Sequence, residues 1–121
     1  MEATLTKSEE LLHDNLGVTS DGVLTVGGQR VTDLVKAYGT PLYLLDENKL
    51  RSKCRTYLNA VRNAFGDRAR VLYASKALSF KRIYEIMREE GMGIDVVSVG
   101  EIATARAAGY PMERAFFHSI F

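Results

Sequence analysis

The sequence predicts an α/β fold built on a parallel sheet. Three short apolar runs, at residues 71–75, 94–97 and 115–118, alternate with stretches of helical spacing at 79–90 and 100–108. Such alternation, with a repeat of about 20 to 25 residues, is typical of β-α-β units whose strands pair in parallel through right-handed crossovers. Glycine follows each helical stretch, where a helix commonly ends.

The region before these units has a different pattern, and we interpret residues 1–37 as an accessory segment with a helix and a strand. The elements expected early in the chain are a helical turn at 11–16, a strand at 22–26, a helix at 31–38 and, after Pro41, a strand at 42–45. The extended start at 42–45 is expected because proline disfavours helical geometry in the residue before it.

A long amphipathic helix should connect the two regions. Asp46 is a candidate N-cap for it, and Gly66 is placed to end it. Cys54, Tyr57 and Phe65 fall on its apolar face, and we expect all three in the core. Cys54 is also the only cysteine, which excludes a disulfide framework and fits a reducing compartment.

Composition excludes several classes of function. The 121 residues are 46% hydrophobic and 26% charged, with a formal net charge of +1, which is ordinary for one soluble domain. No basic block suggests nucleic acid, and no apolar run is long enough for a membrane span. The polar start lacks the order of a signal peptide. We therefore expect a cytoplasmic protein with a small-molecule substrate, no nucleic-acid or membrane partner, and no metal site.

Lys76 is the strongest candidate for chemistry. It ends the apolar run at 71–75, and an ammonium group at the mouth of a buried strand is costly to desolvate unless it is paired or in use. In a partly dry pocket the amine loses its proton more readily and can form a Schiff base with a carbonyl substrate or with pyridoxal phosphate. The alternative is a strand-end lysine whose ammonium reaches water.

The length leaves the complete architecture open. A parallel sheet needs cover on both faces, whereas the crossover helices would cover one. The chain is either a small three-stranded α/β domain or the front piece of a larger fold, since a full (β/α)8 barrel takes roughly 250 residues.

Four segments resemble the fold-type III pyridoxal-phosphate decarboxylases, and among these the diaminopimelate decarboxylases. They are YGTPLYLLD at 38–46, YASKA at 73–77, GMGIDVVSVGE at 91–101 and AAGYP at 107–111. The resemblance extends from about Leu24 to His118. It implies a partial (β/α)8 TIM-type barrel, in which residues 38–121 supply the first three strands and residues 1–37 belong to the β-domain.

The resemblance also implies an activity: decarboxylation of meso-diaminopimelate to L-lysine and carbon dioxide, in lysine biosynthesis, by a homodimer that uses pyridoxal 5′-phosphate. Lys76 would hold the cofactor and act in catalysis together with Asp95, whose carboxylate would hold the lysine ammonium. Ala74, Asp95 and Glu101 would line the cofactor site. Structural roles remain open for both carboxylates, because Asp95 can cap the next helix and Glu101 can match its dipole.

The chain departs from the family pattern after His118, where Ile120 and Phe121 replace an Asn-rich stretch. The family's glycine-rich phosphate loop and C-terminal β-domain do not occur in the sequence, so we expect an N-terminal fragment that is inactive alone. Two alternatives stay open. One is a decarboxylase of ornithine, arginine or carboxynorspermidine, and the other is a non-catalytic, barrel-derived binding module.

Overall fold

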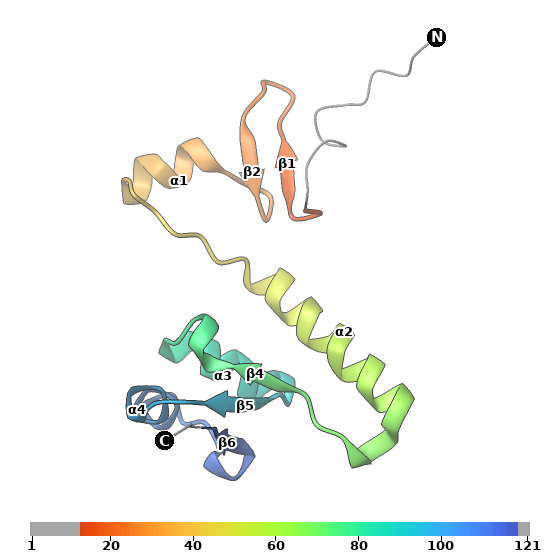
Figure 1. Cartoon of the computed structure of the whole chain (residues 1–121). Helices are drawn as coiled ribbons and strands as arrows, with labels where there is room; N and C mark the ends of the chain where they lie inside the picture. The colour runs from red at the N-terminus through yellow and green to blue at the C-terminus, as the bar shows by residue number, and fades with distance from the viewer. Residues whose placement is uncertain (1–12, 119–121) are drawn as a thin grey trace. The chain divides into compact units, whose positions relative to one another are not determined.

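The computed structural model describes residues 13–118, which divide into two compact units, one up to Leu50 and one from Arg51 onward. In the first unit, β1 (Leu16–Val18), β2 (Leu24–Val26) and β3 (Gln29–Arg30) form an antiparallel sheet in that order, and α1 (Val31–Tyr38) follows (Figure 1). The strand at 22–26 and the helix at 31–38 are therefore confirmed.

Two expectations for this unit are wrong. The helical turn does not extend to Leu16, because Leu16 pairs with Val26 in the β1–β2 ladder; Leu11 and Leu12 lie outside the described residues. Residues 42–45 form no strand, since no strand among residues 13–118 pairs with them. The N-cap prediction holds, because the Lys49 N–H donates to Asp46 Oδ1 at 3.0 Å where α2 (Glu47–Phe65) begins.

The second unit contains the expected β-α-β-α-β order. The strands β4 (Leu72–Ala74), β5 (Gly93–Val96) and β6 (Ala115–Phe117) form a parallel sheet in that order. Helix α3 (Lys81–Glu90) connects β4 to β5, and α4 (Val99–Ala107) connects β5 to β6. Single turns η1 (Gly66–Arg68), η2 (Ser75–Ala77) and η3 (Met112–Arg114) complete the unit. The described chain thus has parallel β-α units and no closed barrel.

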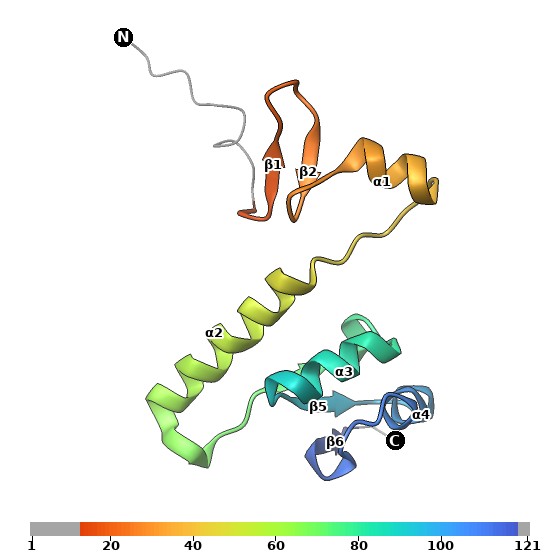
Figure 2. The same ribbon diagram turned by 180° about the vertical axis from the view of Figure 1, so that it is seen from behind.

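The core of this unit lies between β5 and its helices. Ile94 and Val96 on β5 are almost fully buried, as are four apolar side chains of α3: Ile83, Tyr84, Ile86 and Met87. Helix α3 lies behind the sheet in Figure 1 and in front of it in Figure 2, so it covers one sheet face. Burial of each such side chain contributes about 1.5–3 kcal/mol, which makes this layer the main source of stability.

The opposite sheet face is open within the described residues. Side chains alternate along a strand, so Asp95 points away from the layer that buries Ile94 and Val96. Leu72 and Phe116, whose neighbours across the ladder are Gly93 and Asp95, are both exposed. Helices therefore cover one face only, as the sequence predicts.

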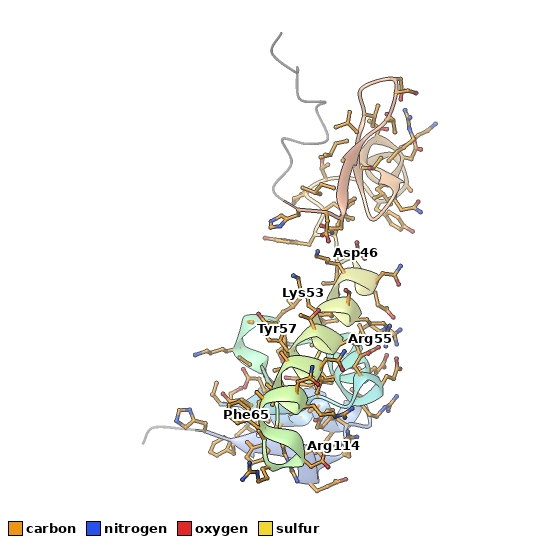
Figure 3. All side chains as sticks on the ribbon, turned by 90° about the vertical axis from the view of Figure 1, so that its right-hand side faces the viewer. Asp46, Lys53, Arg55, Tyr57, Phe65 and Arg114 are labelled. Atoms are coloured by element: carbon orange, nitrogen blue, oxygen red, sulfur yellow. The ribbon has the colours of Figure 1, made fainter. Side chains whose placement is uncertain are left out.

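Helix α2 packs through only part of its apolar face. Cys54 is buried, as expected, and its Sγ lies 3.9 Å from Met87 Sδ of α3. Tyr57 and Phe65 are 60% and 57% exposed, so their predicted place in the core is wrong (Figure 3). None of the helices among residues 13–118 combines the length and the apolar character needed to cross a membrane.

Candidate functional site

Lys76 lies where the chain leaves the sheet. Strand β4 ends at Ala74, and the single turn η2 carries Lys76 away from the strand axis. Its side chain is exposed and has no hydrogen-bond or ion-pair partner among residues 13–118. The described residues do not give this lysine the partly dry setting expected for it, because they leave its side chain exposed. The amine is instead open to a reagent from solvent.

The backbone around Lys76 is anchored on both sides of the turn. Tyr73, the second residue of β4, donates its phenolic O–H to the Leu78 carbonyl at 2.9 Å and so closes the segment that contains Lys76. Burial raises the pKa of the Tyr73 phenol, which keeps it a donor at neutral pH. Ser75 is fully buried, and its Oγ has no partner among the described residues. The turn is therefore fixed although the lysine side chain is not.

Asp95 lies on the neighbouring strand at the same end of the sheet. The parallel register places Asp95 opposite Ala74, two residues before Lys76. Its side chain is half-buried, on the sheet face that the helices leave open. In parallel α/β sheets, ligands bind beyond the carboxyl ends of the strands. The structure thus brings Ala74 and Asp95 together directly and places Lys76 just beyond them.

Glu101 lies in the first turn of α4, next to the segment that connects this helix to β5. Its Oε2 accepts a hydrogen bond from the Val97 N–H at 2.6 Å, and its own N–H donates to Ser98 Oγ at 3.2 Å. Ser98 is the N-cap of α4, and its side chain supplies the cap hydrogen bond. The contacts that the structure gives Glu101 are therefore with the backbone of this turn, and contact with a cofactor stays a prediction.

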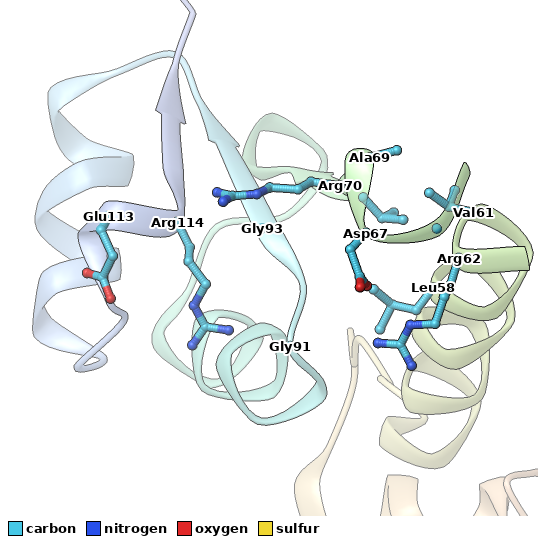
Figure 4. Close-up of a pocket in the computed structure, with 12 residues that line it drawn as sticks. Leu58, Val61, Arg62, Asp67, Ala69, Arg70, Gly91, Gly93, Glu113 and Arg114 are labelled. Atoms are coloured by element: carbon cyan, nitrogen blue, oxygen red, sulfur yellow. The ribbon is translucent and has the colours of Figure 1, made fainter. Parts of the chain in front are cut away.

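A separate pocket of about 530 Å³ opens at the other end of the sheet, where the strands begin. The Arg70 and Arg114 side chains, from the residues before β4 and β6, extend toward the gap beside Gly93 (Figure 4). Arg62, near the end of α2, also lines it. Asp67 and Glu113 line the same pocket. The sequence analysis does not predict this group of charges, because Arg114 lies far along the chain from Arg62 and Arg70. The pocket does not include Lys76 or Asp95.

Comparison with known proteins places these features in a family. Residues 48–120 match the family described as pyridoxal-dependent decarboxylase, pyridoxal binding domain. A diaminopimelate decarboxylase of Bacillus methanolicus is 40% identical over 106 residues, which are 88% of this chain and 24% of that protein. The enzyme of Bacillus subtilis strain 168 is 42% identical over 107 residues, with the same coverage of both proteins.

The fold is also similar to that of a solved protein that carries the same name as these two relatives. Diaminopimelate decarboxylase from M. jannaschii, in complex with L-lysine, superposes with a TM-score of 0.78 at 26% identity, over 89% of this chain and 25% of that one. The chain spans about a quarter of the length of the relatives it matches. The family match covers more than half of the chain and includes Lys76, Asp95 and Glu101. The chain belongs to the pyridoxal-binding domain family of the pyridoxal-dependent decarboxylases.

Proposed function

We propose that this chain supplies the cofactor lysine of a pyridoxal-phosphate-dependent enzyme that decarboxylates meso-diaminopimelate to L-lysine. The curated relatives, at 40% and 42% identity, carry the name diaminopimelate decarboxylase. The M. jannaschii protein of that name was solved with L-lysine. These names favour diaminopimelate over other basic amino acids as the substrate.

The residues present fit pyridoxal phosphate. An aldehyde cofactor needs an accessible primary amine, and the Lys76 amine is exposed and unpaired among residues 13–118. The amine also follows the carboxyl end of a parallel strand, which is where (β/α)8 enzymes have their active sites. A carboxylate at the same end of the sheet, on Asp95, is an acceptor suited to holding a lysine ammonium. This shared location of amine and carboxylate is the observation that carries the proposal.

Each residue then has a definite task. Lys76 Nζ would hold the cofactor covalently. When that bond is released, the lysine ammonium would lie at the sheet end that carries Asp95, whose carboxylate would accept its hydrogen bonds. Ala74, opposite Asp95, offers only a methyl group and so leaves room on that sheet face for a planar ring. When bound, pyridoxal phosphate accepts the electron pair left on the substrate carbon as carbon dioxide departs.

The proposal includes the larger architecture. We assign β4, β5 and β6 as the first three strands of a (β/α)8 barrel, with residues 38–121 in the barrel and residues 1–37 in a β-domain. The open sheet face, with Leu72, Asp95 and Phe116, supports this assignment because a barrel would enclose it. A homodimer in the cytoplasm is part of the same proposal, and the lone thiol of Cys54 fits that reducing compartment.

A chimeric enzyme tests the function. The matching 107-residue segment of the Bacillus subtilis enzyme is replaced by the aligned residues of this chain, and release of carbon dioxide from meso-diaminopimelate is measured. We expect activity in the chimera and its loss in Lys76→Ala. Lys81→Ala is the matched control, since Lys81 is an exposed lysine five residues further on, at the start of α3.

Two results would contradict the proposal. One is equal carbon dioxide release by the chimera with and without Lys76. The other is a folded, dimeric chimera that binds pyridoxal phosphate and decarboxylates ornithine or arginine but not meso-diaminopimelate, which would leave the cofactor assignment intact and remove the substrate.

A further inference from the structure

The carboxylate of Glu101 is engaged by backbone rather than left free at the end of the sheet. The 2.6 Å hydrogen bond from the Val97 N–H to Glu101 Oε2 is short and charge-assisted, and such bonds are roughly twice as strong as neutral ones. Glu101 is only 9% exposed, so little water competes for its oxygens. A second bond, from the Glu101 N–H to Ser98 Oγ, fixes its backbone at the start of α4.

This pair of hydrogen bonds is a variant of the capping box. In the usual form, the carboxylate of the third helical residue bonds the N–H of the N-cap itself. Here Ser98 is the N-cap, and Glu101 instead reaches Val97, one residue earlier. The Glu101 carboxylate therefore reaches past the N-cap and holds Val97, the residue that directly follows β5.

The position of Val97 gives this contact its importance. Val97 comes two residues after Asp95, so restraint of its amide restrains the end of β5 that carries the carboxylate. The same end is held from the side, where the His118 N–H donates to the Val96 carbonyl at 2.9 Å. Strand β5 is thus fixed by β6 on one flank and by Glu101 from α4.

Resting on the proposed function, we propose that Glu101 is a positioning residue. It orders the turn after β5 and so keeps Asp95 at the same end of the sheet as Lys76, without touching the cofactor. A direct role would require its negative charge near Lys76, whereas a positioning role requires only an acceptor oxygen for Val97. Glutamine supplies that oxygen without the charge, so Glu101→Gln separates the two roles.

The test uses the 121-residue chain and two measurements. Hydrogen exchange at the Val97 amide measures how firmly the Glu101 carboxylate holds the residue after β5. The second measurement is the rate at which pyridoxal phosphate attaches to Lys76. Borohydride reduction traps the product, and peptide mass spectrometry shows which lysine carries it. In Glu101→Ala we expect about tenfold less protection at Val97, as for loss of one strong hydrogen bond, and several-fold slower attachment. Glu101→Gln should stay within about twofold of the unaltered chain in both measurements, since its amide oxygen still accepts from Val97.

Two further substitutions serve as a positive and a negative control. Ser98→Ala removes the second bond of the same turn and should shift both measurements in the same direction as Glu101→Ala. Glu113 is an exposed glutamate of η3, and Glu113→Ala should change neither measurement. Circular dichroism shows whether Glu101→Ala still folds. If it does not, the same two measurements are compared between Ser98→Ala and Glu101→Gln, and the positioning role predicts that only Ser98→Ala differs from the unaltered chain.

Two outcomes overturn the positioning role. In the first, Glu101→Gln attaches as slowly as Glu101→Ala while Val97 stays protected, which means that the charge acts on Lys76 directly. In the second, Glu101→Ala loses protection at Val97 but attaches at the full rate. Failure of the proposed function has a different signature: in the unaltered chain, Lys76 would be labelled no faster than Lys81.

Discussion

Glu90, the last residue of α3, connects this helix to α2 and is the best place to test what holds the second unit together. Its Oε1 accepts from Arg51 Nη1 at 2.8 Å, and its Oε2 accepts from Arg55 Nε at 2.7 Å. The side chains of Glu90, Arg51 and Arg55 are 7%, 18% and 64% exposed. The two ion pairs therefore differ greatly in their access to water.

The cost of Glu90→Ala follows from these exposures. Loss of the shielded bond to Arg51 costs about 1.5 kcal/mol, the lower range for a hydrogen bond to a charged group. The exposed pair with Arg55 is screened by water and adds little. We expect the free energy of unfolding to fall by about 1.5 kcal/mol, which lowers the urea midpoint by roughly 1 M.

The matched control is Glu89→Ala. Glu89 precedes Glu90 on α3 and also pairs with Arg51, but its side chain is 39% exposed. Its loss should cost about 0.5 kcal/mol in the same urea titration, followed by circular dichroism at pH 7. Equal losses for Glu89→Ala and Glu90→Ala would refute the reasoning, because burial would then not decide the strength of these ion pairs.

The same contact predicts a pH dependence. Hydrogen bonds from Arg55 and then Arg51 lower the pKa of Glu90 below its ordinary value of 4.5. Because the folded-state pKa is depressed, this stabilisation is fully present above the unfolded-state pKa and is lost as pH falls through the folded-state pKa. Glu90→Gln should remove that part of the acid dependence, so the stability difference between the two chains should shrink below about pH 4.

Two further substitutions test packing in the parallel sheet and in the turn that follows β4. Ser75→Ala should raise the free energy of unfolding by about 1 kcal/mol in urea titration, because it removes a buried hydroxyl without a described partner; Ser79→Ala, which breaks a 2.8 Å contact with the Tyr84 hydroxyl, should not stabilise. Gly93→Ala should destabilise by about 1–3 kcal/mol, since its Cβ would lie 2.4 Å from Leu72 Cδ2. A thermal melt of Gly93→Ala unchanged from the parent chain would show that Leu72 moves aside freely.

The sequence predicts the β-α-β-α-β region well because its signals are local. Apolar runs and glycine stops define β4, α3, β5 and α4 without knowledge of their neighbours. Residues 42–45 have an equally apolar pattern but form no strand, since a strand also requires a partner that the pattern does not reveal. Helical spacing likewise placed Tyr57 and Phe65 on one face of α2 but did not show what lies opposite them.

For the candidate site too, local sequence signals predict some features, and others depend on contacts between distant residues. The YASKA segment predicts Lys76 at the end of a strand, and the structure places it two residues after β4 ends, in η2. The pairing of Ala74 with Asp95 depends on ladder register, which sequence alone leaves undetermined. The bond from Val97 to Glu101 could not be foreseen either, because it involves a backbone amide one residue outside the usual motif.

Ala74 and Asp95 are paired on adjacent strands, so the distance between the ends of β4 and β5 does not depend on the helices that connect them. Adjacent strands keep a fixed spacing of about 4.8 Å whatever connects them. A longer or shorter connection at residues 79–80, after the Leu78 carbonyl that anchors the Lys76 segment, would leave Lys76 and Asp95 on their own strand ends. The position of the proposed amine and carboxylate is therefore set by the sheet and does not depend on how the chain reaches α3.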